Sequence, residues 1–374
     1  MNSLKSEIQF LFSGMGMPYE KVCLMVAVVT TVLMTLLLGN NIAREVPVSI
    51  IDLDHSKYSL EMAQKIDASP SMKVKHILYT PENPETFLYQ DQSFAVVVFP
   101  KDMEKNAYAG EGGTIGLFVD NTNTALDADI RAEMNTIIGI ENATAAQASG
   151  ASGGSFSLSE RVLFNPSGSS SNGEVQGFLF FFSSMFFTFA TIGMVPRLKM
   201  THEWEPLLKT GNPFLLAVKL LPYMGCLLVA FFVGMAILRL LGNMVFAGNI
   251  LAFFMTQLLY LPALGMLSLL FGWNASNPGI ANSRMILLIP AGFILGGATG
   301  PISLYEPWVV WFSHLFPLTW EYNFIRDIIL RGAGLLEMVD ILGGFLIYLA
   351  VIILLFCVAF EKSRKSMESM EGCE

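Results

Sequence analysis

The hydrophobic pattern of the chain is dominated by apolar segments long enough to cross a membrane. The hydrocarbon core of a bilayer is about 30 Å thick and a helix rises about 1.5 Å per residue, so one span needs about 20 mostly apolar residues. Five such segments follow one another in the C-terminal half, and a sixth, residues 22–38, stands alone near the N-terminus. The five segments are residues 177–195, 214–240, 250–273, 285–303 and 338–360. The pattern predicts an α-helical polytopic membrane protein with six transmembrane helices.

A long polar stretch separates the first span from the second, and its pattern predicts a mixed α/β domain. Strand-like apolar runs alternate with two segments of helical spacing, which favours a small sheet packed by helices. From Ala143 to Gly173 the chain is rich in Ala, Ser and Gly, a composition typical of flexible linkers that would hinge this domain to the membrane. The predicted strands are residues 46–51, 72–78, 94–99 and 115–119, and the predicted helices are residues 59–66 and 126–140.

The basic residues of the short loops predict the orientation of the spans. An N-terminus in the cytoplasm places both termini inside and the long domain outside. The first span lacks a small-x-small cleavage pattern after Leu38, so it is interpreted as an uncleaved anchor. The inner face then receives Lys5, Lys21, Arg197, Lys199, Lys209, Arg284, Lys362, Arg364 and Lys365, against Arg239, Arg326 and Arg331 outside.

Six regions follow from spans and orientation together. A cytoplasmic N-terminal segment (1–21) precedes transmembrane helix 1 (22–39), and the extracytoplasmic α/β domain with its Ser/Gly-rich linkers covers 40–175. A five-helix transmembrane domain (176–361) contains a charged cytoplasmic segment (197–213) and a broken apolar segment (302–334), and a cytoplasmic tail (362–374) ends the sequence.

Composition and charge narrow the range of possible functions. Hydrophobic residues make up 53% and charged residues 14% of the chain, well below the roughly 25% charged residues of a soluble domain. From Arg44 to Glu174 there are nine Lys and Arg against eighteen Asp and Glu, which accounts for the net charge of -9. An acidic extracytoplasmic domain argues against nucleic acid as a partner. The four cysteines form neither a disulfide framework nor a zinc pattern.

The sequence was searched for a metal site and for a phosphate-binding loop. Asp52, Asp54 and His55 follow an apolar strand and resemble a metal site, but residues in this position more often cap the following helix through backbone N–H groups, so capping is preferred and no metal is predicted. The chain contains no Gly-Lys dipeptide and therefore no G-x-x-x-x-G-K-[ST] phosphate loop. If nucleotide energy is used, another chain supplies it.

The broken segment 302–334 predicts a re-entrant element. Pro307 and Pro317 interrupt it, yet its aromatic residues are too apolar for an ordinary loop. Irregular backbone at membrane depth survives only against protein or a water-filled cavity. We therefore expect this segment to dip into the outer leaflet with Arg326, Asp327 and Arg331 at its wet edge. Its aromatic residues include Trp308, Trp311, Phe312 and Phe316.

Small residues and the lack of charge characterise the spans. Gly292, Gly296 and Gly300 recur every four residues, which allows close approach of another helix, either of the same chain or of a second protomer. Ionisable residues are almost absent from the span interiors. Because such residues usually mark ion pathways, their absence favours an apolar or amphipathic cargo, such as a drug-like molecule or a lipid, over an ion.

The order of these features resembles that of type-2 ABC exporter permeases with a long ectodomain. The resemblance covers nearly the whole chain and is carried by the ectodomain start 46–56, by the stretch 161–166 before the second span, by the charged segment 197–212 and by 315–332 before the last span. In that family a short cytoplasmic helix with a Glu-x-Glu or Glu-Trp-like pattern docks on the ATPase. The matching residues here are His202, Glu203, Trp204 and Glu205. The short, weakly basic N-terminus departs from the family, which leaves the first ATPase contact open.

The resemblance implies a bacterial inner-membrane subunit that itself catalyses nothing. It would pair with a second permease protomer, identical or not, and with a cytoplasmic ABC ATPase dimer that binds ATP and Mg. Relatives with this ectodomain often associate with a periplasmic adaptor and an outer-membrane channel. The resemblance also makes segment 302–334 an outer gate, with Trp308, Trp311, Phe312, Phe316, Arg326 and Arg331 as its candidate residues.

Two hypotheses from other functional classes compete with the transporter hypothesis. A membrane-anchored receptor or assembly scaffold would bind a partner through the ectodomain and use its spans only as anchors. A neighbouring gene for an ATPase would distinguish the two. An intramembrane enzyme is disfavoured, because His314 and the acidic residues near it form no recognisable catalytic spacing.

Overall fold

The computed structural model describes residues 45–122, 124–149, 155–165, 174–242, 244–298, 302 and 305–371. These residues belong to one compact unit that starts at Glu45. The predicted N-terminal segment and first transmembrane helix lie outside the described residues, as do parts of the predicted linkers and Gly300.

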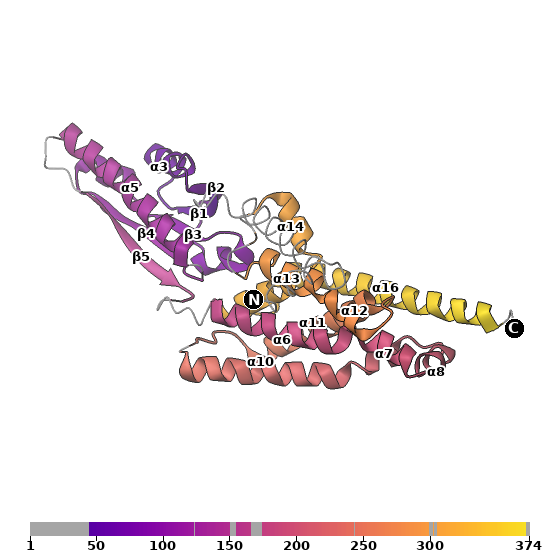
Figure 1. Cartoon of the computed structure of the whole chain (residues 1–374). Coiled ribbons are helices and arrows are strands. Elements are labelled where there is room, and N and C mark those ends of the chain that lie inside the picture. Colours follow the sequence, from indigo (N-terminus) through magenta and orange to yellow (C-terminus); the bar gives the residue numbers. More distant parts are fainter. Residues whose placement is uncertain are drawn as a thin grey trace, which may run out of the picture. The chain divides into compact units, whose positions relative to one another are not determined.

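The predicted α/β domain is built on a five-stranded sheet in the order β2-β1-β3-β4-β5 (Figure 1). Strand β1 runs parallel to both β2 and β3, whereas β3 and β4 are antiparallel and β4 and β5 are parallel. Every residue of β1 is buried, as expected of a central strand covered on both faces. The strands are β1 (Val46–Asp52), β2 (Met72–Leu78), β3 (Ala95–Phe99), β4 (Gly113–Asp120) and β5 (Phe156–Leu163).

Three helices and two short 3-10 turns complete this region. Helix α3 contacts β2, α4 contacts β4 and α5 contacts β5, and α3 also packs against the other two helices. A cluster of buried side chains joins residues of β1, β3 and β5 to Leu88, which stands between the two 3-10 turns; its members are Ile51, Leu88, Val96 and Leu163. The elements are α3 (Lys57–Asp67), η1 (Pro84–Phe87), η2 (Tyr89–Asp91), α4 (Met103–Ala109) and α5 (Thr124–Ser149).

The four predicted strands and both predicted helices are present, but the linker prediction is wrong for part of its range. Helix α5 continues to Ser149, and β5 occupies residues that composition assigned to a linker. Strand β5 pairs with β4 along its whole length, from Gly113↔Phe156 to Asp120↔Leu163. Its exposed Ser, Glu and Arg side chains give this segment a composition that is also typical of a polar connector.

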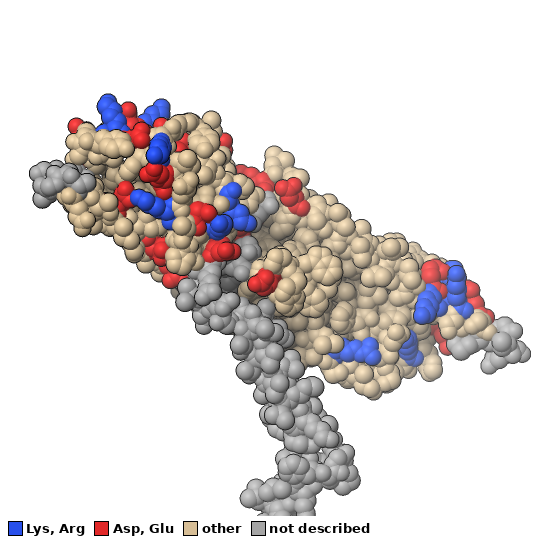
Figure 2. All heavy atoms as spheres, turned by 90° about the horizontal axis from the view of Figure 1, so that it is seen from above, with Lys and Arg blue, Asp and Glu red and all other residues tan. Residues whose placement is uncertain are grey.

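The remaining helices form an apolar bundle that contains five candidate membrane spans among the described residues. Helix α6 packs against α10, α11 and α13, and α11 also packs against α15 and α16. Figure 2 shows charged side chains spread over the α/β region and gathered again where α16 finishes, with almost none on the visible helical surface between. The long helices are α6 (Glu174–Ile192), α10 (Leu221–Leu241), α11 (Ile250–Gly272), α13 (Met285–Leu295) and α16 (Val339–Glu371).

Short helices connect the long ones and occupy the two predicted irregular segments. Pro307 and Pro317 each stand in the first turn of a helix, where the missing N–H of proline costs nothing. Helix α13 ends before the predicted limit of its span, because Gly296 caps it and Gly297 takes a positive φ of 85°. The short elements are α7 (Met194–Met200), α8 (Trp204–Lys209), α9 (Phe214–Val218), α12 (Pro278–Ser283), α14 (Pro307–Ser313), α15 (Pro317–Ile325) and η5 (Arg326–Leu330).

Candidate functional site: an ion-pair junction and a charged connector

The first candidate site is a buried ion-pair cluster that begins at η5. This element is a π-helical turn that directly continues α15, and the N–H of Arg331 donates to the carbonyl oxygen of Arg326 at 3.1 Å. Such wide turns are rare and occur frequently at functional sites. Here the turn holds Arg326, Asp327 and Arg331 within one short stretch.

Arg331 is the centre of the cluster and uses its whole guanidinium group. Its Nη1 donates to Asp327 Oδ1 at 2.7 Å, and its Nε and Nη2 donate to Asp120 Oδ2 at 3.0 and 2.5 Å. Its Nη2 also donates to Asp91 Oδ1 at 2.5 Å. Arg331 is only 4% exposed, so three carboxylates compensate a cation that is removed from water.

Asp91 joins the two arginines. Its Oδ1 accepts from Arg331, and its Oδ2 accepts from Arg326 Nη1 at 2.5 Å. Arg326 Nη2 donates in addition to the carbonyl oxygen of Gly297 at 2.7 Å, next to the end of α13, where a cation is favoured by the helix dipole. Asp91 has a left-handed φ of 54°, which few residues other than glycine adopt. One carboxylate of the α/β domain thus binds both arginines, and Arg326 extends the network to the end of α13.

The electrostatics of the cluster favour its charged form. Burial raises the pKa of Asp91, but the guanidinium groups of Arg326 and Arg331 outweigh burial and hold that pKa below its ordinary value. Removing one partner from a buried pair leaves an uncompensated charge and typically costs about 3–5 kcal/mol. Exposed pairs contribute roughly 0–1 kcal/mol. The cluster is therefore a stiff connection between the sheet domain and the helical bundle.

The predicted position of the charges at the wet edge of segment 302–334 is wrong for two of the three. Asp327 is 1% exposed and Arg331 is 4% exposed, because Asp91 and Asp120 of the α/β domain bind Arg331 and Arg331 in turn binds Asp327. Sequence reasoning missed Asp91 and Asp120, which lie 240 and 211 residues from Arg331. The available signal was the pair of arginines itself, since cations in an otherwise apolar stretch require anionic partners.

The predicted glycine face meets the predicted gate within the same chain. A Cβ atom on Gly292 would lie 3.1 Å from Cβ of Phe316 and 3.2 Å from Cβ of Leu318, and one on Gly296 would lie 3.2 Å from Cα of Thr319. These glycines let α13 approach the start of α15 closely. The close partner of Gly292 and Gly296 is thus segment 316–319, while Gly300 lies outside the described residues.

The aromatic residues proposed for the gate do not gather around the ion pairs. Trp308 and Trp311 are 62% and 74% exposed, and Phe312 is also exposed and contacts Phe316 with ring centroids 5.6 Å apart. The two tryptophans and Phe312 offer a surface on α14, whereas Arg326 and Arg331 form the buried junction. The six candidate residues thus divide into two groups.

The second candidate site is the charged connector, which is anchored by Trp204. Trp204 is 7% exposed, and its ring lies edge-on to Trp273 and Phe360, with centroids 5.4 and 6.4 Å away. Lys199 Nζ lies 5.6 Å from the centre of the Trp204 ring and donates to the carbonyl oxygen of Trp273 at 2.7 Å. Trp204 therefore fixes the first turn of α8 to the end of α11 and to α16.

The neighbours of Trp204 point to solvent. His202, Glu203 and Glu205 are all exposed, and Glu203 Oε2 lies 3.4 Å from Lys219 Nζ in an exposed ion pair. His202 has a left-handed φ of 57°, which turns the chain between α7 and α8. The four residues singled out from the sequence thus consist of one buried anchor and three exposed side chains, one of which pairs with Lys219.

The two sites lie at opposite ends of α11. At its start, the N–H of Ala247 donates to the carbonyl oxygen of Ile329 in η5 at 2.8 Å. At its end lies Trp273, the contact of Trp204. The helix has 23 residues, which corresponds to about 34 Å at 1.5 Å per residue. One helix therefore links the ion-pair junction to the charged connector.

Buried polar groups inside the described candidate spans are uncharged. Ser184 Oγ and Tyr260 Oη lie 2.8 Å apart, and Gln257 Nε2 donates to Glu321 Oε1 at 2.7 Å. Glu321 is fully buried but belongs to α15, outside those spans. The other buried polar residues there are Gln176, Thr188, Thr191, Thr256 and Ser268.

Asp52 and Asp54 bind backbone N–H groups, as the capping interpretation predicts, but the helix that follows them, α3, is capped by Ser56 instead. Asp52 Oδ1 accepts from the N–H groups of Asp54 and His55 at 3.0 and 3.1 Å. Asp54 accepts from the N–H groups of Met103 and Glu104 and thereby caps α4, whereas α3 is capped by Ser56. The described residues hold no group of three or more His, Cys, Asp or Glu side chains arranged for a metal ion.

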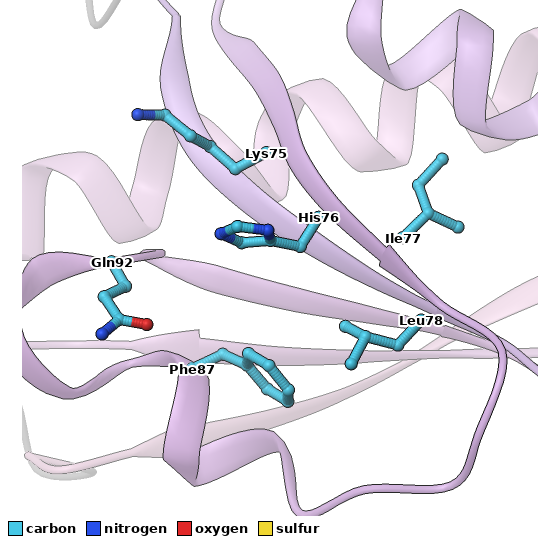
Figure 3. A pocket seen from close by; sticks show the side chains of 6 residues that line it. All are labelled: Lys75, His76, Ile77, Leu78, Phe87 and Gln92. Carbon is cyan, nitrogen blue, oxygen red and sulfur yellow. The ribbon is translucent and has the colours of Figure 1, made fainter.

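A hollow of about 380 Å³ lies beside the edge strand β2 (Figure 3). It is open to solvent and offers the side chains of Lys75 and His76 next to apolar Leu78 and Phe87. Gln92, which also lines it, follows Asp91 in the chain. The hollow is a surface feature of the α/β domain and not an enclosed cavity in the bundle.

Comparison with known proteins places the chain in a family. A family model described as ABC-2 family transporter protein matches residues 22–360. This range contains both candidate sites and all five candidate spans up to Phe360. No curated protein matches the chain.

Proposed function

Because the chain belongs to the ABC-2 transporter family, a family of ABC permeases, we propose that it is the permease subunit of an ATP-driven exporter. Its cargo is an apolar or amphipathic small molecule or lipid that leaves the cytoplasm or the inner leaflet. The chain is a multi-pass membrane protein, and we place it in a bacterial inner membrane with both termini in the cytoplasm. A second permease protomer completes the path.

The coupling proposal rests on the arrangement around α8. An ATPase can transmit force only through a segment that is exposed to it and firmly attached to the membrane helices. Segment 202–205 meets both conditions, because Trp204 is packed against Trp273 and Phe360 while His202, Glu203 and Glu205 face solvent. ATP and Mg bind to the partner ATPase dimer, and its closure moves α8 and the ends of α11 and α16.

The cargo proposal rests on the neutral interior of the spans. The buried polar side chains in the described parts of the candidate spans are Ser, Thr, Tyr and Gln, which can bind a polar group without the desolvation cost of a charge. A pathway for inorganic ions requires charged or carbonyl-rich sites. The uncharged interior of the spans suits an apolar molecule instead. It would move by alternating access or by lateral extrusion between helices, in contact with membrane lipids.

The outer part of the path is assigned to segment 302–334. Gly292 and Gly296 hold α13 against the start of α15, and the ion pairs close the same region from the side of the α/β domain. A periplasmic adaptor leading to an outer-membrane channel would bind the extracytoplasmic domain, whose edge strand β2 and neighbouring hollow are open to solvent.

The proposal is tested by purifying the chain with the ABC ATPase encoded nearest to it. The parent chain is compared with a variant that carries His202→Ala, Glu203→Ala and Glu205→Ala, and with Glu368→Ala as a control, an exposed glutamate near the end of α16. We expect a complex that hydrolyses ATP with the parent and the control, and loss of that complex with the triple variant. Failure of the parent chain to bind any ABC ATPase would contradict the proposal.

A further inference from the structure

The junction described above connects three parts of the chain that are far apart in sequence. Asp91 and Asp120 come from the α/β domain, Arg326 and Arg331 from η5, and Gly297 from the end of α13. Two separate elements of the α/β domain therefore converge on one short turn of the bundle. Asp120 ends β4, and Asp91 ends η2, four residues before the start of β3 at Ala95.

The carboxylates are held in place from their own side. The N–H of Thr122 donates to Asp120 Oδ1 at 2.9 Å, which leaves Oδ2 for Arg331. Beside it, Asn121 Nδ2 donates to the carbonyl oxygen of Asn165 at 2.8 Å, and Asn165 Nδ2 donates to the carbonyl oxygen of Asn121 at 3.3 Å. These bonds fix the ends of β4 and β5 at the junction, so Asp120 is preorganised for Arg331.

We propose that Asp91 and Asp120 act as a latch by which the extracytoplasmic domain holds the outer end of the transport path closed. The latch rests on the proposed transport function, because the element it fixes, η5, continues from α15 and lies beside the glycine face of α13. Opening the outer end moves η5 away from the α/β domain and must break several charge-assisted hydrogen bonds together. Asp91 and Asp120 are positioning residues: they act on the path through Arg326 and Arg331.

The residue that reports on the latch is Ala333. It is fully buried, stands close to Arg331 in the chain, and its N–H donates to the carbonyl oxygen of Asp327 at 2.8 Å. In a chain whose Cys23, Cys226, Cys357 and Cys373 are replaced by Ser, Ala333→Cys provides one thiol at the junction. A membrane-impermeant maleimide added from the outer side then measures how often the junction opens.

The test compares the labelling rate of this thiol in parent and latch variants of the purified permease in lipid vesicles. We expect labelling at least tenfold faster with Asp91→Asn plus Asp120→Asn, a change that corresponds to about 1.4 kcal/mol. Arg331→Gln should do the same, and Arg331→Lys should restore part of the protection because the charge remains while the fork of donors is lost. Asp67→Asn removes an exposed pair with Lys73 and should leave the rate unchanged.

A second reporter separates a latch from general loosening. Ser268→Cys places a thiol at a fully buried position in α11, and its labelling should stay slow in the latch variants. Equal labelling of Ala333→Cys in parent and double variant would overturn the proposal, and so would a parallel rise at position 268. With the ATPase bound, a non-hydrolysable ATP analogue should speed labelling of the parent at position 333. If only this last response is missing, the latch stands and the transport proposal fails.

Discussion

Truncation of Trp204 is the perturbation that separates anchoring from docking in the charged connector. Trp204→Ala removes a side chain that is 7% exposed and that contacts Trp273, Phe360 and Lys199. The exposed residues His202, Glu203 and Glu205 stay in place. Any effect of the substitution therefore acts through the attachment of α8 to the bundle.

The expected cost follows from burial. Replacing a buried Trp by Ala typically lowers the free energy of unfolding by about 3–5 kcal/mol, because contacts are lost and a cavity remains. Trp204 lies at an end of the bundle, where neighbours can relax, so we expect a value near 3 kcal/mol. Trp204→Phe keeps an aromatic ring at the site and should cost less than half as much. Trp311→Ala, at a position that is 74% exposed, should change stability by about 0.5 kcal/mol or less.

The assay has two readings. The first is the midpoint of thermal denaturation in detergent, for which the fraction of monodisperse protein is the signal. The second is the amount of cargo transported per ATP hydrolysed by the reconstituted complex. Trp204→Ala should lower both, whereas Glu205→Ala should lower only the second. An unchanged thermal midpoint for Trp204→Ala, or equal losses for Trp204→Ala and Trp311→Ala, would refute the anchor.

Three further predictions concern other parts of the chain. Gly248→Ala should clearly lower the thermal midpoint of the purified chain, because its Cβ would lie 2.1 Å from the carbonyl oxygen of Ile328. In the control Gly343→Ala the added Cβ meets nothing within 4 Å, so this substitution should be neutral or stabilising by up to about 1 kcal/mol. Glu321→Gln should preserve the fold, whereas Glu321→Leu leaves the buried amide of Gln257 without its acceptor and should cost about 1–3 kcal/mol in a denaturation experiment. Because the pKa of Asp91 is held below its ordinary value, its contribution is fully present above that value and is lost only as the pH falls through the lower folded pKa. Maleimide reacts with the thiolate, which becomes scarce at low pH, so the labelling rate of Ala333→Cys is divided at each pH by the rate of the same thiol in the denatured chain. This ratio should be the same at pH 8 and pH 5, and a marked rise of the ratio at pH 5 would contradict this assignment.

The sequence predicted best those strands and helices whose apolar residues follow a regular local pattern. Strand β2 has the predicted bounds, and β1 and β3 differ from theirs by one residue. Valine or isoleucine recurs in all three strands, without interruption in β3 and between polar residues in β2. Helix α11 differs from its predicted span by one residue. In these elements local composition and burial agree, so the pattern alone was sufficient.

The elements that were missed depend on contacts between distant residues. Strand β5 exists because β4 pairs with it, and its Ser-Leu-Ser-Glu-Arg sequence gives little local indication of a strand. The burial of Arg331 depends on Asp91 and Asp120, which no period in the sequence connects to it. For Trp204, the charges around it predicted an exposed segment, and only the packing against Trp273 and Phe360 reveals it as an anchor.

The most direct test of the account is ATP-dependent transport by the chain in vesicles that contain the ABC ATPase encoded nearest to it. A fluorescent amphipathic probe is followed across the bilayer with ATP and Mg, and the parent chain is compared with the triple variant of His202, Glu203 and Glu205. The account predicts probe movement away from the ATPase side that requires ATP and disappears in the triple variant. A complex that hydrolyses ATP and moves only inorganic ions, or a chain that recruits no ATPase, would contradict it.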